Sequence, residues 1–171
     1  MTRIALLLAL ALAGSACASI QEAPHDPAQR QPLLDSVKAL EGVWESKAPD
    51  GTLLVTEFKV TSAGSAVREI MFPGSAEEMT NVYCLDGNAL ALTHYCAMGN
   101  QPRMLATGRE GKKIHFAHSS VTDLERPDEM YMGELTLEFV DQDHLVERWR
   151  SYVRGVLQQQ HNVDFELTRR K

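Results

Sequence analysis

The polar residues best placed for chemistry in this sequence are Arg68, His94, His118 and Glu147. Each stands two and four residues, or two residues on either side, from apolar residues, so in a strand it would share the face of those residues. A mainly apolar lumen with a few convergent polar groups is the usual composition of a small-molecule site. We therefore predict that these four side chains and Trp149 line a ligand-binding site. The same polar groups could instead be buried partners of one another, since an interior charge must be paired.

A second candidate group lies in or beside a turn that contains Pro102. The Arg103 guanidinium, with the amides of Asn100 and Gln101, could hold a carboxylate at the mouth of the site, because the arginine fork matches that group. The alternative role of these residues is to bond nearby loop carbonyls and fasten the turn.

Other chemistries have less support in the pattern. His94 and Glu147 could form a general acid–base pair if the fold brings them within hydrogen-bond reach. No catalytic residue is assigned, because the sequence has neither G-x-S-x-G nor a glycine-rich phosphate loop. His94, Cys96 and His118 lack metal-ligand spacing, so no metal site is predicted. A single histidine, His94 or His161, could bind haem, but one histidine is too common to identify a cofactor. The cofactor therefore stays unknown.

The elements that must position these residues are one short helix followed by strands. Pro32 to Leu40 has apolar residues on one helical face and Gly42 behind it. After it the apolar period changes to two, with turn signals between short segments. The predicted strands are Val43–Ser46, Leu53–Thr61, Ser65–Phe72, Met79–Leu85, Ala89–Cys96, Arg103–Thr107, Lys112–His118, Gly133–Val140, His144–Val153 and Asn162–Thr168.

The connections between the predicted strands are short turns, so consecutive strands should pair as antiparallel neighbours. Closure of the sheet into a barrel removes its exposed edge strands. We therefore predict an all-β fold, an antiparallel up-and-down barrel of about ten strands with the N-terminal helix closing one end. A two-layer sandwich fits the same spacing. The longest irregular stretch, Ser119 to Met132, could be a lid over the mouth or a solvated acidic loop. Cys84 and Cys96 flank the turn at Gly87 too unevenly for a disulfide, so two separate thiols are expected.

The first eighteen residues read as a signal peptide, with one base, an apolar run from Ile4 to Ala13 and small residues after it. Cleavage after Ala18 would give a freely secreted or periplasmic protein. Cleavage before Cys17 would instead leave a lipid-modified cysteine and a membrane-anchored lipoprotein. Residues 19–31 are predicted to be a disordered tether, and residues 32–171 the barrel domain.

The charge balance argues against some partners. The chain has 17 Lys and Arg against 23 Asp and Glu, a net charge of −6. Such a surface does not favour nucleic acid or anionic membranes, which require basic patches. No stretch reaches the roughly 20 apolar residues of a membrane-spanning helix. Apart from a possible lipid on Cys17, we expect no membrane contact, and we expect a monomer.

Two sets of residues resemble known groups of proteins. Gly42-Val43-Trp44 stands directly after the helix and opens the first strand, which resembles the lipocalin-like (calycin) barrels. That resemblance implies that Trp44 closes the barrel floor and that an arginine of the last strand, Arg169, stacks on it. The segments Gly64–Val67, Phe72–Gly74, Leu92–Cys96 and Gly99–Met104 resemble a set of uncharacterised exported bacterial proteins, which implies no particular activity.

The leading hypothesis is therefore an exported small-molecule-binding β-barrel that holds a partly apolar ligand, which could have an anionic end, in its lumen. Its apolar lining would be Leu90, Leu92, Phe116, Leu137 and Trp149. One alternative is a barrel enzyme using His94 and Glu147 as acid and base. The other is a filled barrel that acts as an interaction protein of the cell envelope.

Overall fold

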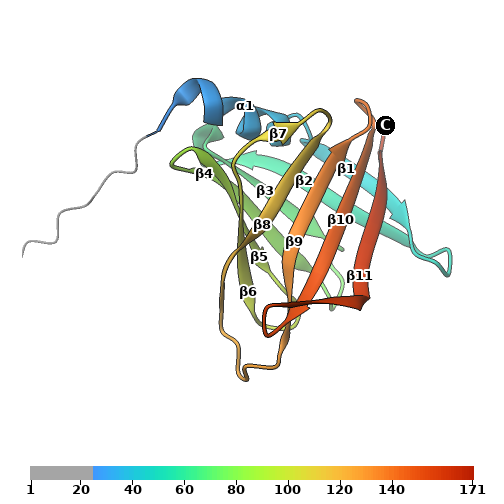
Figure 1. Cartoon of the computed structure of the whole chain (residues 1–171). Coiled ribbons are helices and arrows are strands. Elements are labelled where there is room, and N and C mark those ends of the chain that lie inside the picture. The colour runs from blue at the N-terminus through green and yellow to red at the C-terminus, as the bar shows by residue number, and fades with distance from the viewer. Residues whose placement is uncertain (1–24) are drawn as a thin grey trace, which may run out of the picture.

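The structure, a computed structural model, describes residues 25–171 as a β-barrel with one helix at an end (Figure 1). The strands follow one another around the wall in chain order, and β6 pairs with β8 while β1 pairs with β11. These two pairings close an antiparallel barrel of ten strands, as the spacing predicts. The elements are α1 (Pro27–Lys38), β1 (Gly42–Lys47), β2 (Leu53–Thr61), β3 (Ala66–Met71), β4 (Met79–Asp86), β5 (Ala89–Tyr95), β6 (Gln101–Ala106), the short β7 (Arg109–Glu110), β8 (Lys113–Thr122), β9 (Met130–Phe139), β10 (His144–Val153) and β11 (Val156–Arg169).

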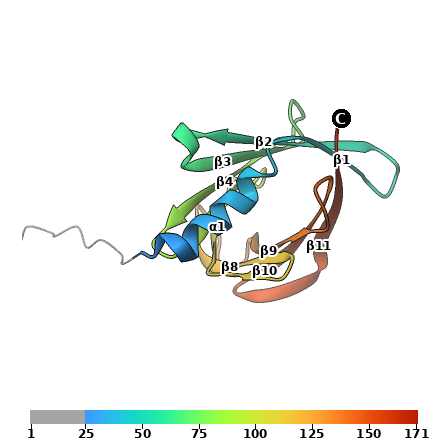
Figure 2. The same ribbon diagram turned by 90° about the horizontal axis from the view of Figure 1, so that it is seen from above.

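Helix α1 lies across one opening of the barrel, as the view from above shows (Figure 2). It begins where the Asp26 side chain accepts a hydrogen bond from the backbone N–H of Ala28, at 2.9 Å, and Pro27 occupies the first helical position. Leu33, Leu34 and Val37 are buried against the barrel. The helix thus removes from water the apolar side chains at that end of the wall.

The helix-capped end is held by Trp44 and Arg169. Trp44 is fully buried, and its indole Nε1 donates to the Leu40 carbonyl at 2.8 Å. The Arg169 guanidinium lies 4.3 Å from the Trp44 ring and donates to the carbonyls of Glu41 and Ala39 at 2.7 and 2.9 Å. The stacking that the lipocalin resemblance implies is therefore present.

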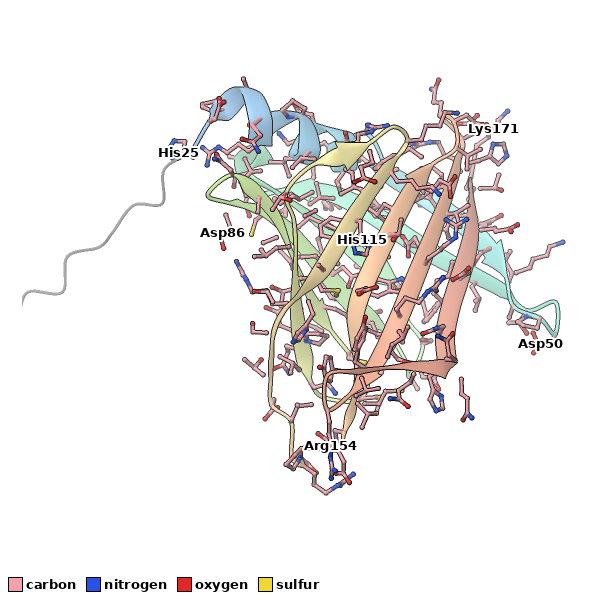
Figure 3. The ribbon with its side chains drawn as sticks, in the orientation of Figure 1. His25, Asp50, Asp86, His115, Arg154 and Lys171 are labelled. Carbon is pink, nitrogen blue, oxygen red and sulfur yellow. The ribbon has the colours of Figure 1, made fainter. Side chains whose placement is uncertain are left out.

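The barrel closes unevenly along the join between β1 and β11. Only two residue pairs connect them, Trp44 with Arg169 and Glu45 with Thr168. Beyond these pairs the β1–β2 hairpin leaves the wall, and Figure 3 shows Asp50 at its tip, away from the barrel. The aromatic rings of Phe72 and Phe165 meet across this join, with centroids 5.8 Å apart.

Several boundaries differ from the sequence prediction, and β11 begins at Val156, six residues before the predicted start at Asn162. The helix begins at Pro27, so the predicted tether is wrong over Pro27–Gln31, because Asp26 caps a helix that continues through Pro32. The predicted irregular loop is wrong at both ends: β8 runs to Thr122 and β9 starts at Met130. The signal peptide and Cys17 lie outside the described residues. Within 25–171, Cys84 and Cys96 are free thiols, and Cys84 pairs with Ala91 across the hairpin.

Candidate functional site

A cluster of polar side chains is buried inside the barrel, and we call it the carboxyl cluster. It contains Glu69 from β3, Asn81 and Tyr83 from β4, His94 from β5 and Glu147 from β10. Four of the five are completely buried, and His94 is 2% exposed. Strand pairing explains part of the assembly, because Asn81 is the Cα partner of both Glu69 and His94.

Most of the cluster is joined by short hydrogen bonds. Tyr83 donates its hydroxyl to Glu69 Oε2 at 2.6 Å, and the Asn81 amide donates to the same oxygen at 2.8 Å. The Asn81 Oδ1 then faces His94 Nδ1 at 2.7 Å. Because Asn81 uses its N–H group on the carboxyl, the His94 Nδ1 must carry the proton that it donates to Oδ1.

The two carboxyl groups complete the cluster. Glu147 Oε2 accepts a hydrogen bond from the Trp149 indole at 3.1 Å. The other oxygen of each group, Oε1 of Glu69 and Oε1 of Glu147, is fully buried and receives no donor group from the described residues. The two carboxyl groups lie close enough for each to shift the pKa of the other.

Burial sets the protonation of this cluster. Loss of hydration raises the pKa of Glu69 to about 7, although Tyr83 and Asn81 donate to it. Burial, and then the nearby Glu69 charge, raise the pKa of Glu147 well above its ordinary value. Burial lowers the pKa of His94 to about 4, so its imidazole is neutral at pH 7. The cluster therefore favours protonated carboxyls and an uncharged imidazole.

Aromatic rings surround the polar groups. The rings of His94 and Trp149 lie 4.9 Å apart, and those of Tyr83 and Phe116 lie 5.8 Å apart. Trp149 is 2% exposed, whereas its strand partner Val163 is 37% exposed. The inner wall therefore meets solvent directly beside Trp149, on the β11 side.

Of the six predicted site residues, the structure brings three together: His94, Glu147 and Trp149 are buried in the lumen. The predicted apolar lining, Leu90, Leu92, Phe116, Leu137 and Trp149, is buried as well. His94 and Glu147 do not bond to each other; Asn81 and Glu69 connect them.

Arg68 is placed wrongly by the sequence, because it is exposed on the outside of β3. Strand β3 turns Val67, Glu69 and Met71 inward instead, and the Ser62–Ser65 connection sets Thr61 opposite Ala66. This register was the signal that could have identified Glu69. It places Glu69 opposite the buried Phe58, on the inner face.

His118 and Arg103 also lie outside the site. His118 is exposed and its ring lies 5.0 Å from that of Tyr131, because β8 leaves β9 beyond Phe116 and continues along β6, where His118 pairs with Met104. Arg103 donates to Asp86 at 2.6 Å on the outer surface. Among the turn residues, Asn100 is buried and donates to the Met130 carbonyl at 3.0 Å, which is the turn-fastening role.

Two hollows open on the surface, outside the lumen. The larger, about 660 Å³, lies in the corner between the β1–β2 hairpin and the outer side of β10 and β11. Two acidic groups that line it already have partners: Asp164 pairs with Arg150, and Glu45 with Arg170. The smaller, about 470 Å³, lies between α1 and the loop at Ala63. Neither is lined by unpartnered buried carboxyl oxygens like those of the carboxyl cluster.

In the part of the chain that the structure describes, no three His, Cys, Asp or Glu side chains gather as a metal site. None of its helices is long and apolar enough to span a membrane. Comparison with protein-family models and with curated proteins found no match to this chain. The functional argument therefore depends on the geometry of the barrel and its carboxyl cluster.

Proposed function

We propose that this chain is an exported binding protein that holds a small, partly apolar molecule in the barrel lumen, beside the carboxyl cluster. One observation carries the proposal: two fully buried carboxyl groups each keep an oxygen without a donor group. Leaving a buried polar atom unpartnered costs about 1–3 kcal/mol, and more when it is charged. A wall built only for stability would contain apolar residues at these positions, whereas a ligand with hydrogen-bond donors would satisfy both oxygens.

The lining suits a molecule of mixed polarity. Leu90, Leu92, Phe116 and Leu137 provide apolar surface around the polar groups. Phe165, the strand partner of Glu147, is only partly buried and lies at the join where β1 leaves β11. Displacement of the Phe165 and Phe72 rings would open a route from this join to Glu147.

The polarity of the site differs from the sequence-based hypothesis. An anionic ligand would need cationic partners, yet Arg68 lies outside the barrel and Arg103 is paired with Asp86. We therefore propose a ligand that donates hydrogen bonds. The stack of Arg169 on Trp44 supports a lipocalin-like barrel, and the N-terminal eighteen residues support export to the periplasm or beyond it, with lipidation at Cys17 as the alternative.

Native mass spectrometry of the full chain, purified from the periplasm, tests this proposal. We expect a fraction of the protein to carry a non-covalent small molecule that is lost from Glu69→Leu, in which one unpartnered oxygen is removed. Arg103→Ala, which changes only the outer surface, serves as the control and should retain the molecule. The proposal would be contradicted if the protein carried no molecule at any gentle ionisation setting and no compound of a small-molecule library stabilised it against unfolding. The same spectra report whether Cys17 carries lipid.

A further inference from the structure

The interior of the barrel contains acids and no charged base. Among the described residues, the buried polar side chains are those of Ser46, Thr56, Glu69, Asn81, His94, Asn100, Glu147 and Ser151. No lysine or arginine is among them, and His94 is neutral because burial lowers its pKa to about 4. Two buried carboxyl groups without a cation must either hold protons or receive a positive charge from a bound molecule.

We propose that the polar end of the lumen ligand is a small organic cation, an ammonium or a guanidinium, which replaces a proton on the Glu69–Glu147 pair. This inference rests on the proposed function, because it assigns the chemical class of the ligand at the same site. The proton balance is direct: one cation enters, one carboxyl O–H bond breaks, and the proton leaves to solvent. The net charge of the interior is unchanged by the exchange.

The geometry around the pair fits such a group. Oε1 of Glu69 and Oε1 of Glu147 are the acceptors that lack donor groups, and an ammonium or guanidinium supplies several N–H donors at once. Trp149 lies beside Glu147, and Tyr83 lies beside Glu69. The Trp149 N–H and the Tyr83 hydroxyl occupy the Oε2 atoms, which leaves the Oε1 atoms as acceptors for a positive head group.

The groups that face the pair do not interfere with the proton exchange. From β4, Tyr83 and Asn81 face Glu69 as neutral donors, and burial raises the pKa of Tyr83 well above its ordinary value. From β5, His94 bonds to Asn81 and stays neutral. On β10, Trp149 donates to Glu147, and from β11 the uncharged Phe165 is the strand partner of Glu147. The two carboxyls are therefore the groups that exchange protons near neutral pH.

Three probes of equal chain length test the ligand class: hexylammonium, hexanol and hexanoate. Isothermal titration calorimetry of the full chain at pH 5.5, 6.5 and 7.5, in two buffers of different ionisation enthalpy, gives the affinity and the number of protons released. We expect hexylammonium to bind best and to release one proton at pH 5.5. Its affinity should rise up to about ten-fold per pH unit below pH 7 and then level off, as expected for exchange of one proton.

Matched variants locate the exchange. Glu69→Gln and Glu147→Gln each remove one acid while keeping its shape, and each should weaken hexylammonium at least ten-fold, whereas the double variant should release no proton. Glu166→Gln makes the same change on an exposed residue of β11 and should leave both quantities unchanged. If a lumen variant fails to fold, the buffer-dependent heat of the unmodified chain still decides the question.

The outcomes separate the two proposals. Binding of hexylammonium without proton release would overturn the cation proposal and leave lumen binding intact. Tighter binding of hexanol or hexanoate would do the same, provided that it quenches the fluorescence of Trp149 in a Trp44→Phe background. No binding by any probe, in protein that also carries no co-purified molecule, would overturn both.

Discussion

The helix-capped end and the carboxyl cluster both place polar groups against buried aromatic rings, but they satisfy those groups differently. At the capped end, the Trp44 indole donates to the Leu40 carbonyl, and Arg169 stacks on Trp44 while donating to the Glu41 and Ala39 carbonyls. In the cluster, Glu69 and Glu147 each keep a buried oxygen that no donor group reaches. The first region uses its polar groups to fix the helix on the barrel. The second maintains an unfavourable arrangement, which is typical of a functional site.

The comparison separates residues that stabilise the barrel from residues that determine how its stability depends on pH. Changes at the capped end should lower the free energy of unfolding at every pH. Changes in the cluster should alter how that free energy depends on pH.

The largest effect is expected for Trp44→Ala. Trp44 is fully buried and its ring packs edge-on against Phe58, 6.3 Å away. Its removal leaves a large cavity at the base of the helix, which should lower the free energy of unfolding by about 3–5 kcal/mol. Urea denaturation measures this loss, and it should be equal at pH 5 and pH 8. A loss below about 1 kcal/mol would contradict the structural role of this end.

The next largest effect is expected for Glu147→Gln, and it concerns the pH dependence of the free energy of unfolding. Because burial raises the pKa of Glu69 to about 7 and that of Glu147 well above its ordinary value, the folded state holds protons that the unfolded state releases above about pH 4.5. The contribution of these protons to the free energy of unfolding is fully present below that pH and is lost as the pH rises through the folded-state pKa values. His94 acts in the opposite sense: its contribution declines as pH falls below about 6.5 toward 4, because its folded-state pKa is lowered.

Relative to the unmodified protein, Glu147→Gln should therefore gain stability as pH rises, by at most about 1.4 kcal/mol per pH unit. Chemical denaturation at half-unit steps from pH 5 to pH 8 measures the slope. Glu166→Gln, on the exposed surface, is the control and should parallel the unmodified protein. Parallel curves for Glu147→Gln would show that Glu147 is ionised in the folded barrel.

A smaller effect is expected for Arg169→Lys. Lysine keeps the charge but lacks the planar fork that reaches the Ala39 and Glu41 carbonyls together. We expect a loss of about 1–2 kcal/mol, visible as a lower midpoint of thermal unfolding with no change in its pH dependence. Hydrogen exchange should localise the loss to α1. Unchanged protection of α1 would mean that the guanidinium does not hold the helix.

The smallest effect is expected for Arg103→Ala, which tests the predicted residue that the fold places on the outer surface. Its ion pair with Asp86 is partly exposed, at 36% and 51% for the two side chains. Such pairs contribute at most about 1 kcal/mol, so stability should change little. Binding of a lumen ligand, measured by calorimetry, should be unaffected. A ten-fold loss of affinity would place the ligand at the barrel mouth instead.

The sequence predicts most of the fold because the alternation of apolar residues is regular in its strands. Leu53–Thr61 and His144–Val153 have the predicted ends, since a turn signal stands at each of their boundaries. The helix start was missed because Pro32 is a usual first residue of a helix, whereas Asp26 and Pro27 form the cap in the structure.

The site is predictable only in part, because alternation assigns a face only after the register is known. His94, Glu147 and Trp149 stand on strands whose inner face is clear from the apolar residues around them. On β3 both faces carry apolar residues, so Arg68 and Glu69 are equally plausible inward residues from pattern alone. His118 is the strand partner of the buried Met104 but is itself exposed, because β8 has already left β9 beyond Phe116. Bulges and long-range pairing depend on the closed sheet and not on the local sequence.

The most direct test of the account is the titration of the glutamate side-chain carboxyls by carbon-13 NMR, with and without hexylammonium. Without a cation, two carboxyl signals should titrate well above the rest, one of them near pH 7, and both should be absent from the Glu69→Gln/Glu147→Gln double variant. Hexylammonium should move at least one of them to lower pH. If every glutamate titrated near pH 4.5, the ordinary value, the buried pair would hold no proton at neutral pH and the account would be wrong.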